Sequence, residues 1–184
     1  EIIGSWHSGS LALLGDAIHV FVDGLSVIVS IIVARRVRKI CQNLSRGNKV
    51  RAIGGYANAA LLGFIAIWIL NESWERLFES KRVFTASMIV AAAVGLAINW
   101  YQHRIMEGAP EVNGHRHVTH ASLDAHILGD LRNSVAVIIA GALIWLTGWL
   151  AWDPIASALI ALWMVIQMFK LFKASYLQSR IYEI

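Results

Sequence analysis

The sequence predicts an all-α, polytopic membrane protein, a bundle of transmembrane helices. Of its 184 residues, 57% are hydrophobic and 15% are charged, and the mean hydropathy is +0.58. This composition is too apolar for a soluble domain of the same length. Apolar runs of about 20 residues recur between short polar connectors, and a helix of that length crosses a hydrocarbon core about 30 Å thick.

Five such runs define the predicted spans. The first and fourth are the longest and carry ionisable residues, the second and third are rich in Gly and Ala, and the fifth begins at Pro154, which is favoured in the first turn of a helix. The predicted spans cover about residues 10–34, 52–70, 83–101, 121–150 and 154–172. We therefore expect residues 1–184 to form a single transmembrane domain, with no soluble domain.

The basic residues lie mainly in alternate connectors. Twelve of them lie after the first span, after the third span and in the tail from Lys170 onward, whereas three lie on the opposite side, namely Arg76, Lys81 and Arg82. Since Lys and Arg are retained on the cytoplasmic side, the first span is predicted to start outside and the tail to end inside. This arrangement explains the net charge of +4 as a topology signal, so nucleic acid is not an expected partner. The single Cys41 excludes an intrachain disulfide and a cysteine-based zinc site.

Two of the spans carry the same motif, H-x-x-x-D. His19 and Asp23 lie in the first span, and His126 and Asp130 lie in the fourth. Residues four apart share one face of a helix, so each pair presents an imidazole and a carboxylate together. One such pair alone is as easily a simple helix-stabilising contact, but two pairs inside apolar spans favour a shared cation site.

Two imidazoles and two carboxylates suit a tetrahedral Zn²⁺ site and tolerate Co²⁺ or Cd²⁺. No cofactor is expected. A closed structural zinc site and an intramembrane zinc enzyme are the alternatives. Structural sites favour Cys, and the H-E-x-x-H string of zinc proteases does not occur in the sequence. A cation channel, which would share these ligands but lack a step that releases the bound ion, is a third alternative.

Two segments resemble the cation diffusion facilitator family of zinc transporters. They are "SGSLALLGDAIHVFVDGLSVIVSIIVA" and "ASLDAHILGDLRNSVAVIIAGALIWLTGWLAWDPIASALIAL", which are similar to the family's second and its fifth-to-sixth transmembrane segments. The resemblance implies six transmembrane helices, a homodimer, and export of divalent metal from the cytoplasm in exchange for protons. It also implies that His19, Asp23, His126 and Asp130 form the transport site.

The sequence departs from the family pattern at both ends. "EIIGSWHSG" is similar only to the end of the family's first helix, and the chain stops at "SRIYEI", where many members continue into a cytoplasmic domain. We therefore expect this chain to lack most of the first helix and the cytoplasmic C-terminal domain, either as a short member of the family or as a fragment of a longer protein. The expected location is a membrane crossed several times, in a bacterial inner or cell membrane.

The remaining polar residues carry weaker predictions. Asp16 and Asp124 are expected to cap helices, with a role on the metal's access path as the alternative. Arg132 is expected to point away from the ligand face, because two residues turn a helix by about 200°. Asn58, Asn99 and Asn133 are expected to form hydrogen bonds between helices. A solvated cytoplasmic loop is expected to contain His103, His115, His117 and His120, with collection of metal ions as the alternative role.

Overall fold

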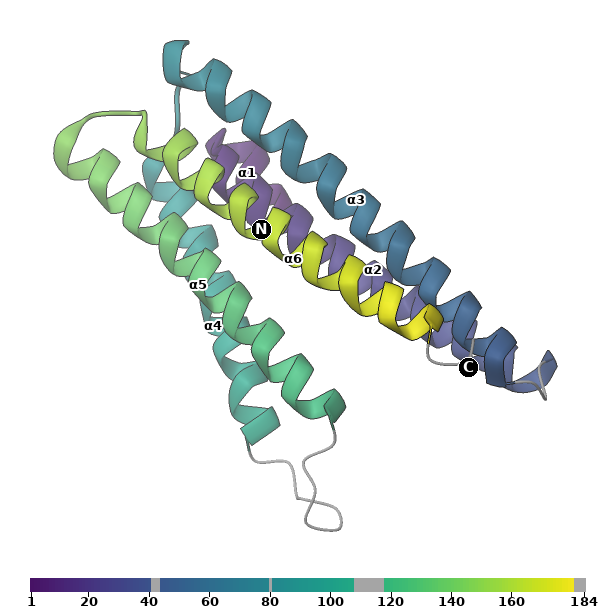
Figure 1. Ribbon diagram of the computed structural model, residues 1–184. Helices are drawn as coiled ribbons and strands as arrows, with labels where there is room; N and C mark the ends of the chain where they lie inside the picture. Colours follow the sequence, from purple (N-terminus) through teal and green to yellow (C-terminus); the bar gives the residue numbers. More distant parts are fainter. Residues whose placement is uncertain (41–43, 80, 108–117, 181–184) are drawn as a thin grey trace. The chain divides into compact units, whose positions relative to one another are not determined.

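The computed structural model describes residues 1–40, 44–79, 81–107 and 118–180, and within these ranges it leaves several stretches of side chains, chiefly 33–51 and 106–127, outside the description. The described residues form six α-helices and no strand (Figure 1). The helices are α1 (Ile2–Ser8), α2 (Leu11–Ile40), α3 (Leu44–Phe78), α4 (Thr85–Glu107), α5 (Val118–Thr147) and α6 (Trp152–Arg180). The all-α fold is confirmed, and each predicted span overlaps one of the helices α2 to α6.

Helix α3 runs past the predicted end of its span at Leu70 and ends at Phe78. The extra turns contain two contacts between residues four apart. Arg76 Nε lies 2.9 Å from Glu72 Oε1, and the rings of Trp74 and Phe78 are 5.2 Å apart. Such pairs stabilise helix in polar sequence, which explains why a segment of mixed charge continues the helix instead of starting a loop.

Two glycines in the left-handed region end helices. Gly9 follows α1 with φ 69°, and its N–H donates to the Ser5 carbonyl at 2.9 Å. Gly148 follows α5, also with φ 69°, and donates to the Ile144 carbonyl at 2.8 Å. Because this backbone conformation strains any residue with a Cβ, glycine sets the end of each helix.

The described helices expose much of their apolar surface. Three of them contain stretches long and apolar enough to cross a membrane, namely Ala52–Phe78, Leu128–Thr147 and Trp152–Leu177. In Ala52–Phe78 and in Trp152–Leu177, only 28% of the most apolar part of the helix is buried within the protein. A soluble helix buries its apolar stripe against the core, so this degree of exposure fits helices that face lipid.

The helices group into two compact units. Unit 1 comprises Glu1–Ala17 and Glu72–Ile160, and unit 2 comprises Ile18–Asn71 and Ala161–Ile184. Helices α2, α3 and α6 each contribute residues to both. We describe each unit by itself.

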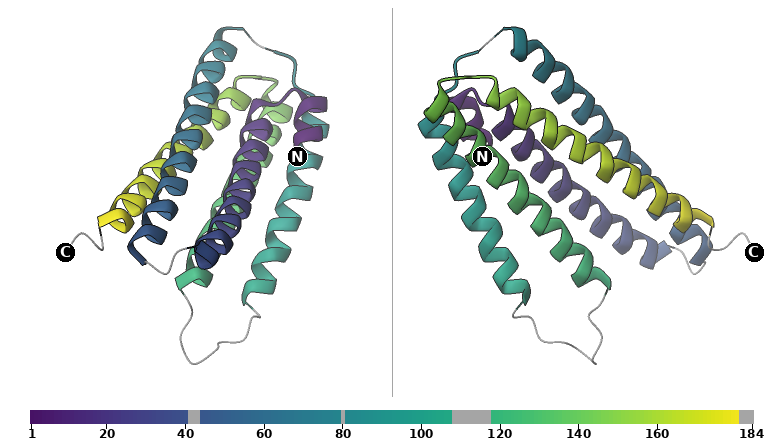
Figure 2. Two further views of the ribbon diagram at one scale, coloured as in Figure 1. Left: turned by 90° about the vertical axis from the view of Figure 1, so that its right-hand side faces the viewer. Right: turned by 60° about the vertical axis from the view of Figure 1, so that its left-hand side comes forward.

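Unit 1 is built around the packing of α4 against α5 and of α1 against α4 (Figure 2). Small residues allow these helices to approach closely. A Cβ placed on Gly141 of α5 would lie 2.6 Å from Ile89 Cγ1 of α4, and one placed on Gly4 of α1 would lie 2.5 Å from Ala91 Cβ. Close backbone approach at glycine is typical of helix packing in membranes.

In unit 2, α3 packs against α6 in the antiparallel sense. Gly55 lies against Ser175, and Gly63 lies against Met168, so rising numbers in α3 meet falling numbers in α6. Between them, the rings of Tyr56 and Phe172 are 5.0 Å apart. Gly55 and Gly63, from the Gly- and Ala-rich second span, therefore lie where α3 meets α6.

Candidate metal centre

The first H-x-x-x-D pair lies in uninterrupted helix. His19 and Asp23 belong to α2, which runs from Leu11 to Ile40 without a break. Their spacing of four residues therefore places them on one face of the helix. The His19 side chain is buried, with 2% of its surface exposed, whereas the Asp23 side chain lies outside the description.

The second pair also lies in uninterrupted helix. His126 and Asp130 belong to α5, Val118–Thr147. Asp130 is buried, with 6% of its surface exposed, and the His126 side chain lies outside the description. Burying an imidazole and a carboxylate in apolar helices is costly unless they are paired, hydrated or bound to a cation.

His19 and Asp23 fall in unit 2, and His126 and Asp130 fall in unit 1. Among the residues whose side chains are described, no three His, Cys, Asp or Glu side chains gather closely enough to hold a metal ion. Two members of the predicted set are outside that part of the chain. The four-residue cage therefore stays a prediction.

Arg132 is exposed, while Asp130 and Ser134 on either side of it are buried. The exposed position agrees with the expectation that Arg132 points away from the ligand face of α5. Its charge is therefore directed away from the buried carboxylate two residues earlier.

Asp16 does not cap α2. The helix begins at Leu11, so Asp16 lies in its second turn, where it is 0% exposed. Its Oδ2 accepts a hydrogen bond of 3.2 Å from the Ser134 hydroxyl of α5. This contact lies within unit 1 and joins two helices that are far apart in sequence, a role that the sequence did not indicate for Asp16.

The other predicted polar residues are only partly described. Asn99 and Asn133 are buried, which agrees with a place between helices, and Asn58 is half-buried. His103 is half-buried, with its ring centroid 6.3 Å from that of Trp100. The predictions for Asp124, His115, His117 and His120 concern side chains outside the described part of the chain.

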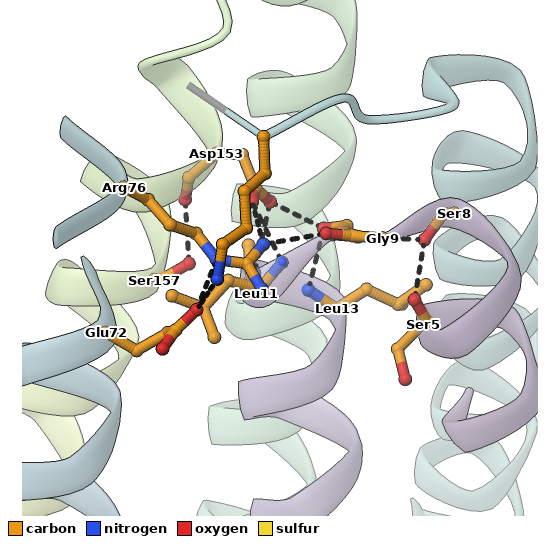
Figure 3. Close-up of polar contacts among 12 residues, drawn as sticks. Ser5, Ser8, Gly9, Leu11, Leu13, Glu72, Arg76, Asp153 and Ser157 are labelled. Atoms are coloured by element: carbon orange, nitrogen blue, oxygen red, sulfur yellow. Dashed lines mark hydrogen bonds and ion pairs between the residues drawn. The ribbon is translucent and has the colours of Figure 1, made fainter. Parts of the chain in front are cut away.

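A polar network in unit 1 holds the start of α2 (Figure 3). The Asp153 carboxylate, from the first turn of α6, accepts hydrogen bonds from Ser10 Oγ at 2.6 Å, Leu11 N at 2.8 Å and Ala12 N at 3.1 Å. Ser10 Oγ in turn accepts from Leu13 N at 3.1 Å. The first N–H groups of a helix have no partner in the helix itself, and a carboxylate also complements their partial positive charge.

Arg76, near the end of α3, completes this network. Its Nη1 donates to the Gly9 carbonyl at 2.7 Å and lies 3.7 Å from Asp153 Oδ2 (Figure 3). Glu72 accepts from Arg76 and, at 2.7 Å, from Lys81. The network thus joins the ends of three helices within unit 1.

Sequence reasoning missed this network. Asp153 precedes Pro154 at the start of α6 and looks like a local capping residue, and Arg76 looks like a connector charge. The available signal was the Ser-Gly-Ser before the apolar run of α2, because serine is favoured at a helix N-cap. Nothing in the spacing of the sequence indicated that the second cap would come from α6.

The fold and these buried groups define the class: a helical membrane protein that crosses the bilayer several times and buries ionisable side chains within its apolar helices. Residues 1–178 match the cation efflux transmembrane domain family. The chain therefore belongs to this family, the cation diffusion facilitators.

Named relatives share about a third of the residues. The chain is 32% identical over 178 residues to the zinc transporter ZitB of Yersinia pestis, covering 96% of this chain and 56% of the relative. It is 32% identical over 164 residues to the cadmium, cobalt and zinc/H(+)-K(+) antiporter of Bacillus subtilis, covering 88% and 52%. It is 31% identical over 183 residues to the probable zinc transporter MSC2 of Saccharomyces cerevisiae, covering 95% and 25%. The chain spans about half the length of the two bacterial relatives.

Proposed function

We propose that this protein exports divalent metal, foremost Zn²⁺, from the cytoplasm in exchange for protons. In this proposal His19, Asp23, His126 and Asp130 form a tetrahedral site that binds the transported ion. The observation that carries the proposal is that both H-x-x-x-D pairs lie in unbroken helix, with His19 and Asp130 buried.

The donor chemistry supports zinc. Two imidazole nitrogens and two carboxylate oxygens form a borderline ligand set that suits Zn²⁺, whereas an all-oxygen set would suit Mg²⁺ or Mn²⁺. Four protein ligands also leave no open position for a catalytic water, which favours transport over an intramembrane zinc enzyme. The relatives described above are named as transporters.

A wider substrate range is the second candidate. The Bacillus subtilis relative is named for cadmium and cobalt as well as zinc. The same four donors accept Cd²⁺ and Co²⁺, and the preference among these ions depends on cavity size and on the groups that surround the ligands. That relative is also named an H(+)-K(+) antiporter, which supports the proton-coupled part of the proposal.

The proposed partners are the metal ion, protons, membrane lipid and a second copy of the same protein. The family resemblance supports the homodimer. Cross-linking of the purified protein in lipid tests it, with a band at twice the monomer mass as the expected result.

Metal flux into proteoliposomes tests the transport function. The protein should transport Zn²⁺ in a saturable way, Cd²⁺ and Co²⁺ in competition with it, and Mn²⁺ poorly. His19→Ala, Asp23→Ala, His126→Ala and Asp130→Ala should each abolish Zn²⁺ flux while the protein still folds. The matched control is Phe21→Leu, since Phe21 lies between the two ligands of α2 and is 60% exposed. Wild-type flux in any of the four alanine variants would contradict the proposed site.

A further inference from the structure

The Asp16–Ser134 hydrogen bond links the two helices that carry the proposed ligands. Asp16 Oδ2 and Ser134 Oγ are 3.2 Å apart, and neither residue has exposed surface. Both belong to unit 1. The bond therefore fixes one point of contact between α2 and α5, away from water.

Each residue of the pair continues a row of ligand positions. In α2, Asp16 precedes His19 by three residues and Asp23 by seven, a spacing that keeps all three within about 60° around the helix. In α5, Ser134 follows Asp130 by four residues and His126 by eight, which keeps those three within about 80°. The bond thus lies at the end of both rows.

The rise of an α-helix converts these spacings into depths. At about 1.5 Å per residue, His19 lies about 4.5 Å along α2 from Asp16, and Asp130 lies about 6 Å along α5 from Ser134. Asp23 lies about 10.5 Å along α2 from Asp16, and His126 lies about 12 Å along α5 from Ser134. If the two helices run in opposite directions, as the predicted topology has them, the proposed cage would pair each histidine with a carboxylate of the other helix, because the paired steps differ by only about 1.5 Å.

We propose that Asp16 and Ser134 are positioning residues, whose hydrogen bond sets the register of α2 against α5 and so the size of the metal cage. The inference rests on the proposed function of the four ligands. A one-residue slip of either helix would move its ligands by about 1.5 Å along the axis and turn them by about 100°. The cage would then no longer hold four donors at the short distances that Zn²⁺ requires, about 2.0–2.2 Å.

The structure also contains a matched serine for comparison. Ser10 donates to the buried Asp153 at 2.6 Å, again between two helices of unit 1. Ser10 lies at the start of α2, before the row of ligand positions. Replacing a serine that only supports folding should lower stability alone, as expected for Ser10. Replacing a positioning serine should in addition change the relative affinity for different ions.

Metal affinities of the purified protein, measured by competition with a chelating dye, test the proposal. Ser134→Ala should weaken Zn²⁺ binding about tenfold, the scale seen when groups that orient metal ligands are removed. It should weaken binding of the larger Cd²⁺ less, so that the Zn²⁺/Cd²⁺ affinity ratio falls. Ser10→Ala should lower the melting temperature without changing this ratio.

Changes at Asp16 separate the hydrogen bond from the charge. Asp16→Asn keeps an oxygen that accepts from Ser134, and it should retain an affinity ratio close to that of the wild type. Asp16→Ala should resemble Ser134→Ala, and combining the two should add nothing, because both remove the same bond. If Asp16→Asn weakens binding as much as Asp16→Ala, the charge matters and the positioning role is wrong.

Two outcomes distinguish this inference from the proposed function. If the alanine variants of the four ligands keep wild-type Zn²⁺ affinity, the proposed site itself fails. If those variants lose binding while Ser134→Ala binds both ions as the wild type does, the site stands and the positioning role is overturned.

Discussion

His19 contributes one of the two nitrogen donors that distinguish the proposed site from an all-oxygen site. His19→Asp would make the ligand set richer in oxygen, and harder ions prefer oxygen ligands. We expect the variant to discriminate less between Zn²⁺ and Mn²⁺. Competition between the two ions in a proteoliposome flux assay measures this, and an unchanged preference for Zn²⁺ would count against His19 as a ligand.

Gly9 and Gly148 share the same backbone conformation but differ in their surroundings. A Cβ on Gly9 would lie 2.9 Å from the Arg82 carbonyl oxygen, whereas a Cβ on Gly148 would have no neighbour within 4 Å. Alanine in the left-handed region costs about 1–2 kcal/mol by itself. Gly148→Ala should therefore lower stability by about that amount and Gly9→Ala by more. Thermal unfolding in detergent compares them, and equal losses would show that the contact with Arg82 has no effect.

At the scale of the element, the start of α2 depends on a residue from another helix. Asp153→Ala removes the acceptor for Ser10 Oγ and for two backbone N–H groups, all of them buried. It also removes the carboxylate oxygen that lies 3.7 Å from Arg76 Nη1, while the ion pair between Arg76 and Glu72 remains. Because hydrogen bonds to charged groups contribute about 1.5–3 kcal/mol each and unsatisfied donors are costly, we expect a loss of about 3 kcal/mol or more.

Ser157→Ala is the control for that experiment. The Ser157 hydroxyl donates to the Asp153 backbone carbonyl within α6, at 2.8 Å, and does not involve the carboxylate. Its loss should cost about 1 kcal/mol. Similar melting temperatures for Asp153→Ala and Ser157→Ala would show that the cap on α2 is not important for stability.

At the scale of the whole molecule, proton exchange follows from the proposed ligands. Metal binds only neutral imidazole and ionised carboxylate, so protons compete with Zn²⁺ for the same groups. Protonation becomes more complete as pH falls, hence Zn²⁺ affinity should fall as pH drops from about 7.5 to about 5.5, around the reference histidine pKa of about 6.5. An acidic outside would then promote release of the ion, and reopening toward the cytoplasm would return the protons.

Calorimetry in buffers of different ionisation enthalpy measures the protons released when Zn²⁺ binds. We expect proton release that grows as pH falls toward the histidine range. Affinity that is independent of pH, together with no proton release, would rule out the exchange mechanism even if the metal site itself is correct.

Two exposed tryptophans lie near the end of α5. Trp145 and Trp149, at the end of α5, have 77% and 55% of their surface exposed. Indole rings favour the boundary between lipid and water. Their position fits a boundary between lipid and water near the end of α5, and the orientation stays a prediction from charge.

The sequence by itself determined the membrane class, the helices and the two H-x-x-x-D pairs. These features depend on composition and on the period of one helix, which local sequence encodes directly. It also indicated that Arg132 points away from Asp130, since that depends only on the rotation of α5. The prediction of a capping role for Asp16 was wrong, because α2 begins at Leu11, close to the predicted start of the span, and Asp16 lies in its second turn.

Only the tertiary structure decided which distant groups pair. Asp153 caps α2 from α6, Arg76 reaches the Gly9 carbonyl from α3, and Asp16 accepts from Ser134 of α5. Each bond joins residues more than 60 positions apart, as the 67 between Gly9 and Arg76 illustrates. Such pairing depends on the depth and rotation of one helix against another. Periodicity leaves these two quantities free, and they are set when the helices pack and every buried polar group must find a partner.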